Sequence, residues 1–334
     1  MTTEASHAPA PPDVSVVIPL KDEEETLREL HARLAAVFEE VGRTFEIVFV
    51  DDGSTDGSMA VLEELHAADP RVHVIRFRRN FGKATALAAG FDAARGAIVF
   101  TMDADLQDDP AEIPRFIERI EAGWDLVSGW KRDRQDPLGK TLPSRLFNRV
   151  TGWATGLRLH DFNCGFKAYR RVVTEQLELY GELHRFIPAL AAWQGFRVCE
   201  IDVVHHPRRH GQSKYGWERM ARGFFDLLTV LLLTRFSRRP LHLFGTVGLL
   251  FCLIGGMGLS YLTVLWFIGD RPIGTRPLLI LSVMLVITGV QLVGIGLVSE
   301  MLTRLEHRAG NLYAIQRVLP SAGRSGSAAQ EKRS

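Results

Sequence analysis

The stretch Ala-Ile-Val-Phe-Thr-Met-Asp-Ala-Asp, residues 97–105, decides the fold. Residues 97–102 carry no charged side chain and have the length of a buried strand that ends in an acidic triplet. Alternate residues of an extended segment share a face, so Asp103, Asp105 and Gln107 are predicted to present their oxygens together. The stretch therefore predicts a cluster of oxygen donors just beyond the carboxyl end of a strand.

The residues before this stretch repeat the order of strand and helix. Strands are predicted at 14–18, 45–50 and 72–77, and helices at 24–41, 58–68 and 83–94. Strands separated by helices of this length form right-handed β-α-β units around a parallel sheet. The predicted fold class is α/β, with a Rossmann-like, mostly parallel sheet that binds ligands outside the carboxyl ends of its strands. Asp51 and Asp52 follow the second strand, so both acidic clusters fall at that edge.

The two acidic clusters have different chemical interpretations. Two carboxylates and the Gln107 amide suit Mg²⁺ or Mn²⁺, with the diphosphate of a substrate supplying further ligands. Without a cation, Asp103 and Asp105 would repel each other. Asp51 and Asp52 have two readings: a carboxylate that accepts hydrogen bonds from a nucleobase or ribose, or a polar turn that caps the next helix.

Composition and charge exclude several classes of protein. In 334 residues the formal net charge is +1, without the basic surplus of a nucleic-acid-binding protein, so no nucleic-acid partner is expected. The three cysteines are far apart and odd in number, which indicates a reducing compartment. Residues 1–12 lack the apolar core of a signal peptide and are predicted to form a disordered tail, followed by a cytosolic domain over residues 13–216.

The carboxyl-terminal part has the composition of a membrane anchor. Residues 241–268 and about 277–300 are long apolar runs, and roughly 20 such residues span a bilayer as a helix. The linker between them is short, which predicts a hairpin in contact with the lipid bilayer. It holds two arginines, fewer than the flanking segments, so the positive-inside rule places both termini of this multi-pass protein in the cytoplasm.

Three further features surround the hairpin. Residues 217–240 are predicted as an amphipathic interfacial helix, the alternative being a core helix of the soluble domain. Residues 301–334 are predicted as a cytoplasmic segment that is partly disordered. Glycines within the apolar runs permit close helix packing within one subunit or in a homo-oligomer; they are Gly255, Gly256, Gly258, Gly289, Gly294 and Gly296.

Ordered motifs of this chain resemble family 2 glycosyltransferases of the GT-A fold. They are Val16-Val17-Ile18-Pro19 with Glu23, Val50-Asp51-Asp52-Gly53-Ser54, Asn80-Phe81-Gly82-Lys83-Ala84-Thr85-Ala86-Leu87 and Asp103-Ala104-Asp105-Leu106-Gln107-Asp108-Asp109-Pro110. The segments Asp161-Phe162-Asn163-Cys164-Gly165-Phe166-Lys167 and His205-His206-Pro207-Arg208-Arg209-His210-Gly211-Gln212-Ser213-Lys214-Tyr215 resemble one branch, that of dolichol-phosphate mannose synthase and bacterial polyprenyl-phosphate glycosyltransferases. The resemblance implies metal-dependent, inverting transfer of a sugar from a nucleotide-sugar to undecaprenyl or dolichyl phosphate on the cytoplasmic face of a membrane.

The resemblance also implies a role for each matched residue. The residues that would bind the nucleotide-sugar are Pro19, Glu23, Asp51, Asp52, Lys83, Asp103 and Ala104. The metal would be held by Asp103, Asp105 and Gln107. The residues that would face the phosphate-bearing substrates are Lys131, Arg134, Arg145, Arg209, Ser213 and Lys214. Asp105, Arg134 and Asp161 are the catalytic candidates.

Two of these positions have alternatives. Relatives often carry arginine where Lys131 stands, and an ammonium lacks the bidentate phosphate contact of a guanidinium. The alternative for Lys131 is a solvated surface charge. Asp161 is a candidate base or an orienting group, and it also suits a cap for the next segment.

A phosphate acceptor explains the absence of a clear general base. A phosphate monoester is mostly dianionic near neutral pH, so it needs cations for positioning and no strong base. Residues 182–188 contain His184 and Arg185 where many family 2 relatives carry an acidic pair. His184 is otherwise interpreted as a structural histidine.

Other functional classes fit less well. A processive polysaccharide synthase would carry a Gln-x-x-Arg-Trp segment and several more membrane spans. A non-catalytic scaffold with a nucleotide-binding fold would not need Asp103, Asp105 and Gln107 intact. A soluble nucleotidyltransferase would share the metal ligands but would not need the hairpin.

Overall fold

The computed structural model describes residues 10–132, 148, 151–152, 155–179, 181, 183–206, 240–269, 274 and 276–309, with side chains as far as residue 302. The predicted interfacial helix lies outside the described residues except for Pro240 at its end. Five predicted site residues also lie outside them: Arg134, Arg145, Arg209, Ser213 and Lys214.

A seven-stranded mixed sheet forms the centre of the amino-terminal domain. Its strands are β1 (Val14–Leu20), β2 (Phe45–Asp51), β3 (Val72–Arg76), β4 (Ile98–Thr101), β5 (Leu126–Trp130), β6 (Lys167–Arg170) and β7 (Val198–Asp202). The strand order is β3-β2-β1-β4-β6-β5-β7. Strands β1 to β4 are parallel to one another and β7 is parallel to β5, whereas β6 runs antiparallel to β4 and β5. The predicted α/β class with a mostly parallel sheet is confirmed.

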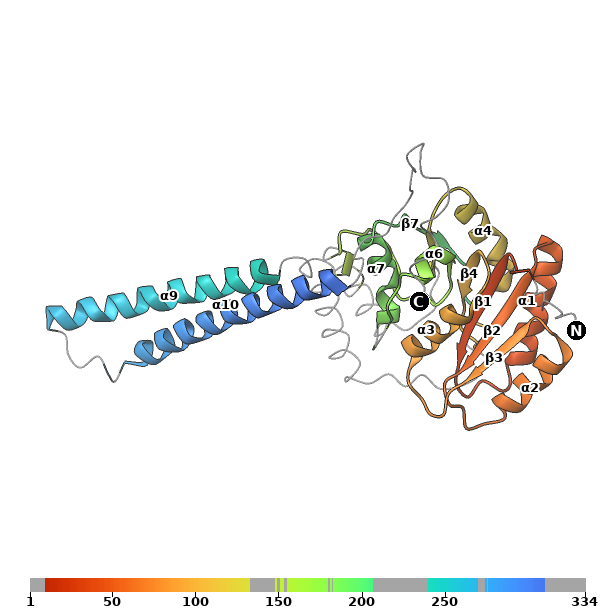
Figure 1. Cartoon of the computed structure of the whole chain (residues 1–334), viewed down its shortest axis with the longest axis horizontal. Helices are drawn as coiled ribbons and strands as arrows, with labels where there is room; N and C mark the ends of the chain where they lie inside the picture. Colours follow the sequence, from red (N-terminus) through yellow and green to blue (C-terminus); the bar gives the residue numbers. More distant parts are fainter. Residues whose placement is uncertain are drawn as a thin grey trace, which may run out of the picture.

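Helices cover both faces of this sheet (Figure 1). They are α1 (Leu27–Val41), α2 (Ser58–Ala68), α3 (Lys83–Ala93), α4 (Ile113–Glu121), α6 (Arg171–Thr174) and α7 (Ile187–Trp193), with 3-10 segments η1 (Pro110–Glu112) and η2 (Leu183–Phe186). One apolar core joins α1, α2 and α4 to the strand side chains of Val16 and Ile18. The other joins α3 and α7 to Val17. This alternation along β1 is the period of two expected for a strand buried on both faces.

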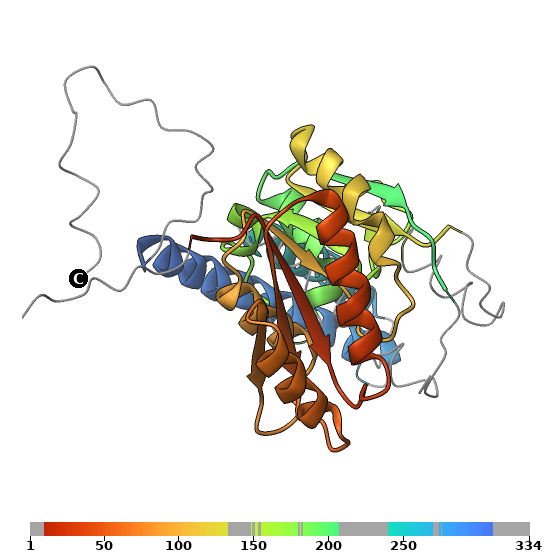
Figure 2. The ribbon, with the colours of Figure 1, turned by 90° about the vertical axis from the view of Figure 1, so that its right-hand side faces the viewer.

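The helix after β1 begins later than predicted. Helix α1 starts at Leu27 rather than at residue 24, and it lies against the face formed by β1 and β2 (Figure 2). The preceding residues bind the neighbouring loop instead: the Glu24 carboxylate accepts a hydrogen bond from the Gly57 N–H at 3.0 Å.

The parallel strands bring their carboxyl ends to one edge. Leu20 pairs with Asp51 in the register of β1 and β2, and Val17 pairs with Thr101 in the register of β1 and β4. The backbone N–H of Met102 donates to the Val17 carbonyl at 3.2 Å. Both acidic clusters therefore lie at the carboxyl edge of the sheet, as predicted.

Two long apolar helices follow the α/β domain, α9 (Pro240–Ile268) and α10 (Pro277–Ala309). Both are long and apolar enough to cross a membrane. A helix of 29 residues is about 43 Å long, which exceeds the roughly 30 Å thickness of a bilayer's hydrocarbon core. They pack side by side, and most of their large apolar side chains are exposed (Figure 1).

Glycines let α9 and α10 approach closely. A Cβ added at Gly255 would lie 2.6 Å from the Ser282 carbonyl oxygen, and one at Gly289 would lie 2.5 Å from the Gly248 carbonyl oxygen. Gly258 and Gly296 also face the opposite helix, whereas Gly256 and Gly294 have no atom within 4 Å of an added Cβ. Four of the six predicted packing glycines therefore act within the hairpin, and Gly248 is a fifth that the sequence did not indicate.

Candidate functional site

The acidic triplet at the end of β4 forms a turn and not an extended segment. The strand ends at Thr101, and Leu106 has a φ of 58°. The prediction that alternate extended residues place the three oxygen donors on one face is wrong in this detail. The turn itself joins two of the donors, because the Gln107 N–H donates to the Asp105 carboxylate at 3.2 Å.

Asp103 lies among cations at the base of this turn. Lys83, at the start of α3, donates to its carboxylate. Burial would raise the pKa of Asp103, but Lys83 and then Lys131 lower it to about 2. Gly165 packs against the same carboxylate, and a Cβ at this position would lie 2.6 Å from Asp103 Oδ2. Asp103 is therefore ionised at neutral pH and is held in place from two sides.

These residues fit part of a hard-cation shell. Asp103, Asp105 and Gln107 supply two carboxylates and an amide group, which is the oxygen chemistry that Mg²⁺ and Mn²⁺ prefer. Within the described ranges, no three Asp, Glu, His or Cys side chains surround a common point. A cation here would take its remaining ligands from water or from a substrate's phosphates, as Mg²⁺ commonly does in phosphate-binding sites.

The structure separates the roles of Asp51 and Asp52. Asp52 accepts hydrogen bonds from the N–H groups of Phe81 at 2.6 Å and Gly82 at 2.9 Å, so it holds the loop before α3. Asp51 is fully buried, and its Oδ1 accepts the Ser54 N–H at 2.8 Å. Its Oδ2 is buried and has no hydrogen-bond partner among the described residues, with Arg76 Nε 3.7 Å away. A buried carboxylate oxygen with unused acceptor capacity is costly unless a ligand satisfies it.

The loop after β1 is joined to the loop after β2. The Glu23 N–H donates to Ser58 Oγ at 3.0 Å, and the Asp22 N–H donates to Ser54 Oγ at 2.9 Å. Pro19, the second-last residue of β1, is partly exposed at the same edge. Pro19 and Glu23 therefore lie next to the Asp51 loop, where the sequence placed the nucleotide.

Lys131 points into the protein. Its side chain keeps only 9% of its surface exposed, and its ammonium lies 3.0 Å from the carboxylate of Asp108, which is also buried. Burial lowers the pKa of Lys131, but the carboxylates of Asp108 and Asp103 raise it more, so the net shift is upward. The alternative of a solvated surface charge at this position is wrong.

Motif 161–167 places a second buried lysine near Asp103. Lys167 is 3% exposed, donates to the Cys164 carbonyl, and has a pKa lowered by burial. Asp161 is also 3% exposed and accepts the Asn163 N–H at 3.0 Å, as a residue that caps a turn does. The motif that contains Lys167 predicts no role for this residue, because nothing local distinguishes it from an exposed strand lysine.

His184 lies beside the same cations. The segment η2 packs against α3, and the pKa of His184 is lowered to about 3 by burial and by Lys83, Arg185 and Lys167. Its Nδ1 is buried and has no hydrogen-bond partner among the described residues. His184 is therefore neutral at physiological pH and cannot supply a charged group to the site.

Comparison with known proteins agrees with this geometry. The family model described as glycosyl transferase family 2 matches residues 15–178. The chain is 38% identical over 301 residues to a dodecaprenyl-phosphate galacturonate synthase of Rhizobium johnstonii, covering 89% of each chain. It is 41% identical over 316 residues to an undecaprenyl-phosphate 4-deoxy-4-formamido-L-arabinose transferase of Pseudomonas aeruginosa, covering 92% of each.

A solved structure shares the fold of the α/β domain. It is glucosyl-3-phosphoglycerate synthase from Mycobacterium tuberculosis in complex with Mn²⁺, uridine diphosphate and phosphoglyceric acid. The TM-score is 0.52 at 18% identity, with 67% of this chain and 78% of that chain covered.

Proposed function

Because the chain belongs to the family 2 glycosyltransferases, we propose that it transfers a sugar from a nucleotide-sugar to a polyprenyl phosphate. One observation carries the acceptor assignment. The two relatives above are named for different sugars but both for a polyprenyl phosphate, and each is similar over about nine-tenths of this chain, the apolar hairpin included. The acceptor class is common to both relatives and the sugar is not, so we assign the acceptor class to this chain and leave the sugar open.

The donor binds at the carboxyl edge of β1, β2 and β4. Asp51 supports this placement because its Oδ2 is a buried acceptor that no described residue satisfies, as a nucleobase or ribose donor group would require. Asp52 acts indirectly by fixing the loop that leads to Lys83. Lys83 and Lys167 place positive charge beside Asp103, where the diphosphate of the donor would meet it.

Asp105, Gln107 and Asp103 hold the divalent cation, Mg²⁺ or Mn²⁺. When bound, the cation stabilises negative charge on the departing nucleoside diphosphate. Lys83 adds charge neutralisation from the protein side, and a fixed positive charge of this kind is most effective where water is excluded.

The acceptor phosphate attacks without a strong base. It is mostly dianionic near neutral pH, and His184, whose pKa is lowered to about 3, is too weak a base to take a proton from it. Positioning of the two substrates and neutralisation of their phosphates then account for catalysis. Direct in-line attack inverts the anomeric configuration, so an α-linked donor gives a β-linked lipid product.

The apolar hairpin brings the reaction to its lipid substrate. Helices α9 and α10 span the bilayer, and the arginine-rich segments that flank them lie on the cytoplasmic side together with the α/β domain. A polyprenyl phosphate presents its phosphate at that membrane surface.

The test is transfer by the purified protein in detergent. A panel of labelled nucleotide-sugars is offered with undecaprenyl phosphate in the presence of Mn²⁺ or Mg²⁺, with chelator, and with Asp105→Ala. A labelled lipid that requires metal and Asp105 establishes the reaction class and identifies the donor. Binding of one nucleotide-sugar without any transfer would overturn the acceptor assignment, and a product of retained configuration would overturn direct in-line attack.

A further inference from the structure

Asp108 is a buried carboxylate that the proposed reaction does not use. Asp108 is 1% exposed and directly follows Gln107 in the chain. Two basic side chains from distant parts of the sequence face it: Lys131 Nζ lies 3.0 Å from Asp108 Oδ1, and His205 Nδ1 lies 3.6 Å from the same oxygen. Asp108 therefore joins the segment after β4 to those that follow β5 and β7.

The segment after β7 is also paired with the same turn through its backbone. Asp108 and His205 form an isolated antiparallel bridge, and the His206 N–H donates to the Gln107 carbonyl at 2.8 Å. The Gln107 side-chain nitrogen donates to the His206 carbonyl at 3.4 Å. The His206 ring lies 3.1 Å from the Asp109 carboxylate. Residues 107, 108 and 109 are thus each tied to residue 205 or 206.

This pairing determines how Gln107 is oriented. An amide whose nitrogen is held by a carbonyl directs its oxygen to the opposite side, and residues that fix a metal ligand in this way strongly affect metal affinity. Backbone strain at Leu106 supports the same conclusion. Leu106 has a φ of 58° between Asp105 and Gln107, and such a conformation persists only where the surroundings enforce it.

We propose that Asp108, held by Lys131 and His205, is a positioning residue that fixes Gln107 for a divalent cation. This inference rests on the metal requirement of the proposed function. In this assignment Lys131 acts through Asp108 and does not need to reach a substrate phosphate. The expected effect on metal affinity follows from other metal sites. There, loss of a residue that orients a metal ligand typically weakens metal binding about 10- to 100-fold.

The test measures Mn²⁺ binding directly, by electron paramagnetic resonance of the purified protein with and without uridine diphosphate. Asp108→Asn is expected to raise the Kd for Mn²⁺ at least about tenfold. The matched control is Asp202→Asn, which removes an exposed carboxylate that pairs with Arg115 at 3.0 Å at the end of β7. The control is expected to bind Mn²⁺ like the wild type.

Thermal unfolding separates positioning from simple support of the fold. A ligand stabilises the folded state according to its affinity. If Asp108 positions Gln107, Asp108→Asn reduces the rise in Tm that Mn²⁺ causes. If Asp108 only supports the fold, the Tm falls by the same amount with and without Mn²⁺, which overturns the proposal.

A double variant covers the case in which the single variant does not fold. Asp108→Asn with Lys131→Met removes both buried charges, so neither is left unpaired. A folded double variant with wild-type affinity for Mn²⁺ overturns the proposal, and one with weakened affinity supports it. Wild-type protein that binds no Mn²⁺ under either condition would instead remove the metal from the proposed function, and the inference with it.

Discussion

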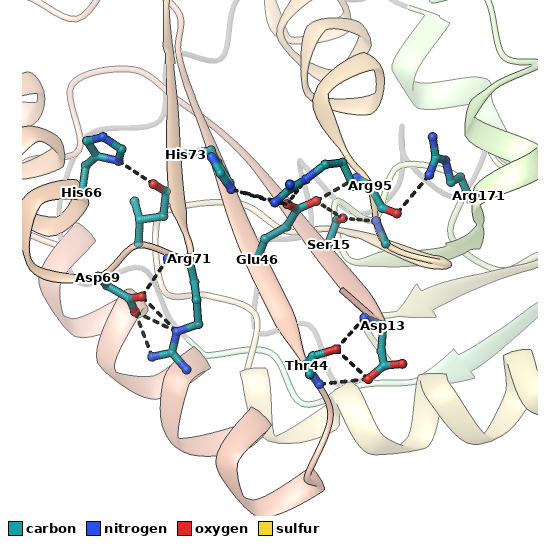
Figure 3. A network of polar contacts seen from close by, with 12 residues as sticks. Asp13, Ser15, Thr44, Glu46, His66, Asp69, Arg71, His73, Arg95 and Arg171 are labelled. Atoms are coloured by element: carbon teal, nitrogen blue, oxygen red, sulfur yellow. Dashed lines mark hydrogen bonds and ion pairs between the residues drawn. The ribbon is translucent and has the colours of Figure 1, made fainter. Parts of the chain in front are cut away.

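Strand β2 carries a buried carboxylate at each end, and the two differ in how fully the protein satisfies their hydrogen bonding. At its amino end, Glu46 is 1% exposed and accepts four hydrogen bonds (Figure 3). They come from Ser15 Oγ at 2.6 Å and from the backbone, Nε and Nη2 of Arg95 at 2.7, 2.9 and 2.7 Å. At its carboxyl end, Asp51 keeps one oxygen without a hydrogen bond to any part of the chain that the structure describes.

The difference separates stability from function within one strand. The protein completes the hydrogen bonding of Glu46, so this carboxylate joins β1, β2 and the end of α3. It leaves acceptor capacity on Asp51, which lies on the edge where ligands of parallel sheets bind. In β2 the satisfied carboxylate holds the fold together, and the carboxylate with a free acceptor oxygen among the described residues is the candidate for a substrate contact.

The largest effect is expected for Asp105→Asn, at the carboxyl edge. Loss of one carboxylate from the metal-binding turn should lower the transfer rate by about 10³-fold, the upper range for removal of one electrostatic stabiliser. Without metal, the variant should unfold at nearly the wild-type temperature, because loss of the Asp105 carboxylate leaves the Glu46 network intact. Transfer assays and thermal unfolding of the same preparation check both statements. A large fall in Tm would contradict the separation of the two edges.

The order of elements and the edge that carries the site were predictable from the sequence. Strand and helix periodicities are local, and parallel topology then places every strand end together. The predicted α2 matches the structure from Ser58 to Ala68, and α3 begins at Lys83 as predicted.

What the sequence could not show depends on contacts between distant residues. The turn after β4 follows from pairing with His206, and Lys131 turns inward because Asp108 is buried beside it. The different roles of Asp51 and Asp52 depend on the loop at Phe81, about 30 positions later in the chain, which binds Asp52. No local sequence pattern predicts these features, because each depends on a tertiary contact between residues far apart in the sequence.

Gly165→Ala should sharpen the comparison by a purely steric change at the carboxyl edge. The new Cβ would lie 2.6 Å from Asp103 Oδ2, so the carboxylate must move. Displacement of a site group by about 1 Å costs on the order of 10²-fold in rate, and the Kd for Mn²⁺ should rise as well. Gly256→Ala is the matched control, since no atom of another described residue is found within 4 Å of its added Cβ. Equal activity of the two variants would show that Asp103 is not held where the reaction needs it.

Asp51→Asn tests whether the unsatisfied oxygen serves the donor. The asparagine oxygen can keep the hydrogen bond from Ser54, but the charge is lost. A hydrogen bond to a charged group contributes about 1.5–3 kcal/mol, so the Kd of the donor should rise roughly 10- to 100-fold. Isothermal titration with the nucleotide-sugar identified in the transfer assay measures this. Unchanged donor affinity together with a lower Tm would assign Asp51 to the fold, like Glu46.

Glu46→Gln is the reciprocal test at the amino edge. The change weakens its pairing with Arg95, whose side chain keeps 43% of its surface exposed, so the expected loss is only about 2 kcal/mol of unfolding free energy. The Kd of the donor and the transfer rate at 20 °C should remain at wild-type values, because the residue lies at the opposite end of β2. A fall in transfer without a fall in Tm would break the comparison.

The same residue gives the smallest and most specific prediction, a dependence on pH. Burial raises the pKa of Glu46, but the Ser15 hydroxyl and Arg95 lower it more, so the folded pKa lies below the ordinary value of 4.5. The charge of Glu46 therefore stabilises the fold fully above about pH 4.5, and this contribution is lost as the pH falls through the folded pKa. The difference in unfolding free energy between wild type and Glu46→Gln should shrink as the pH falls from about 5 toward 3.

Unfolding followed by tryptophan fluorescence measures that difference, and Glu64→Gln is its control. Glu64 pairs with Arg28 on the surface, with 60% of its side chain exposed, so its removal should change the stability little at any pH. A difference for Glu46→Gln that persists unchanged at pH 3 would mean that the carboxyl group stabilises the amino edge as a neutral hydrogen-bonding group. The contrast with Asp51 would then rest on hydrogen-bond satisfaction alone and not on charge.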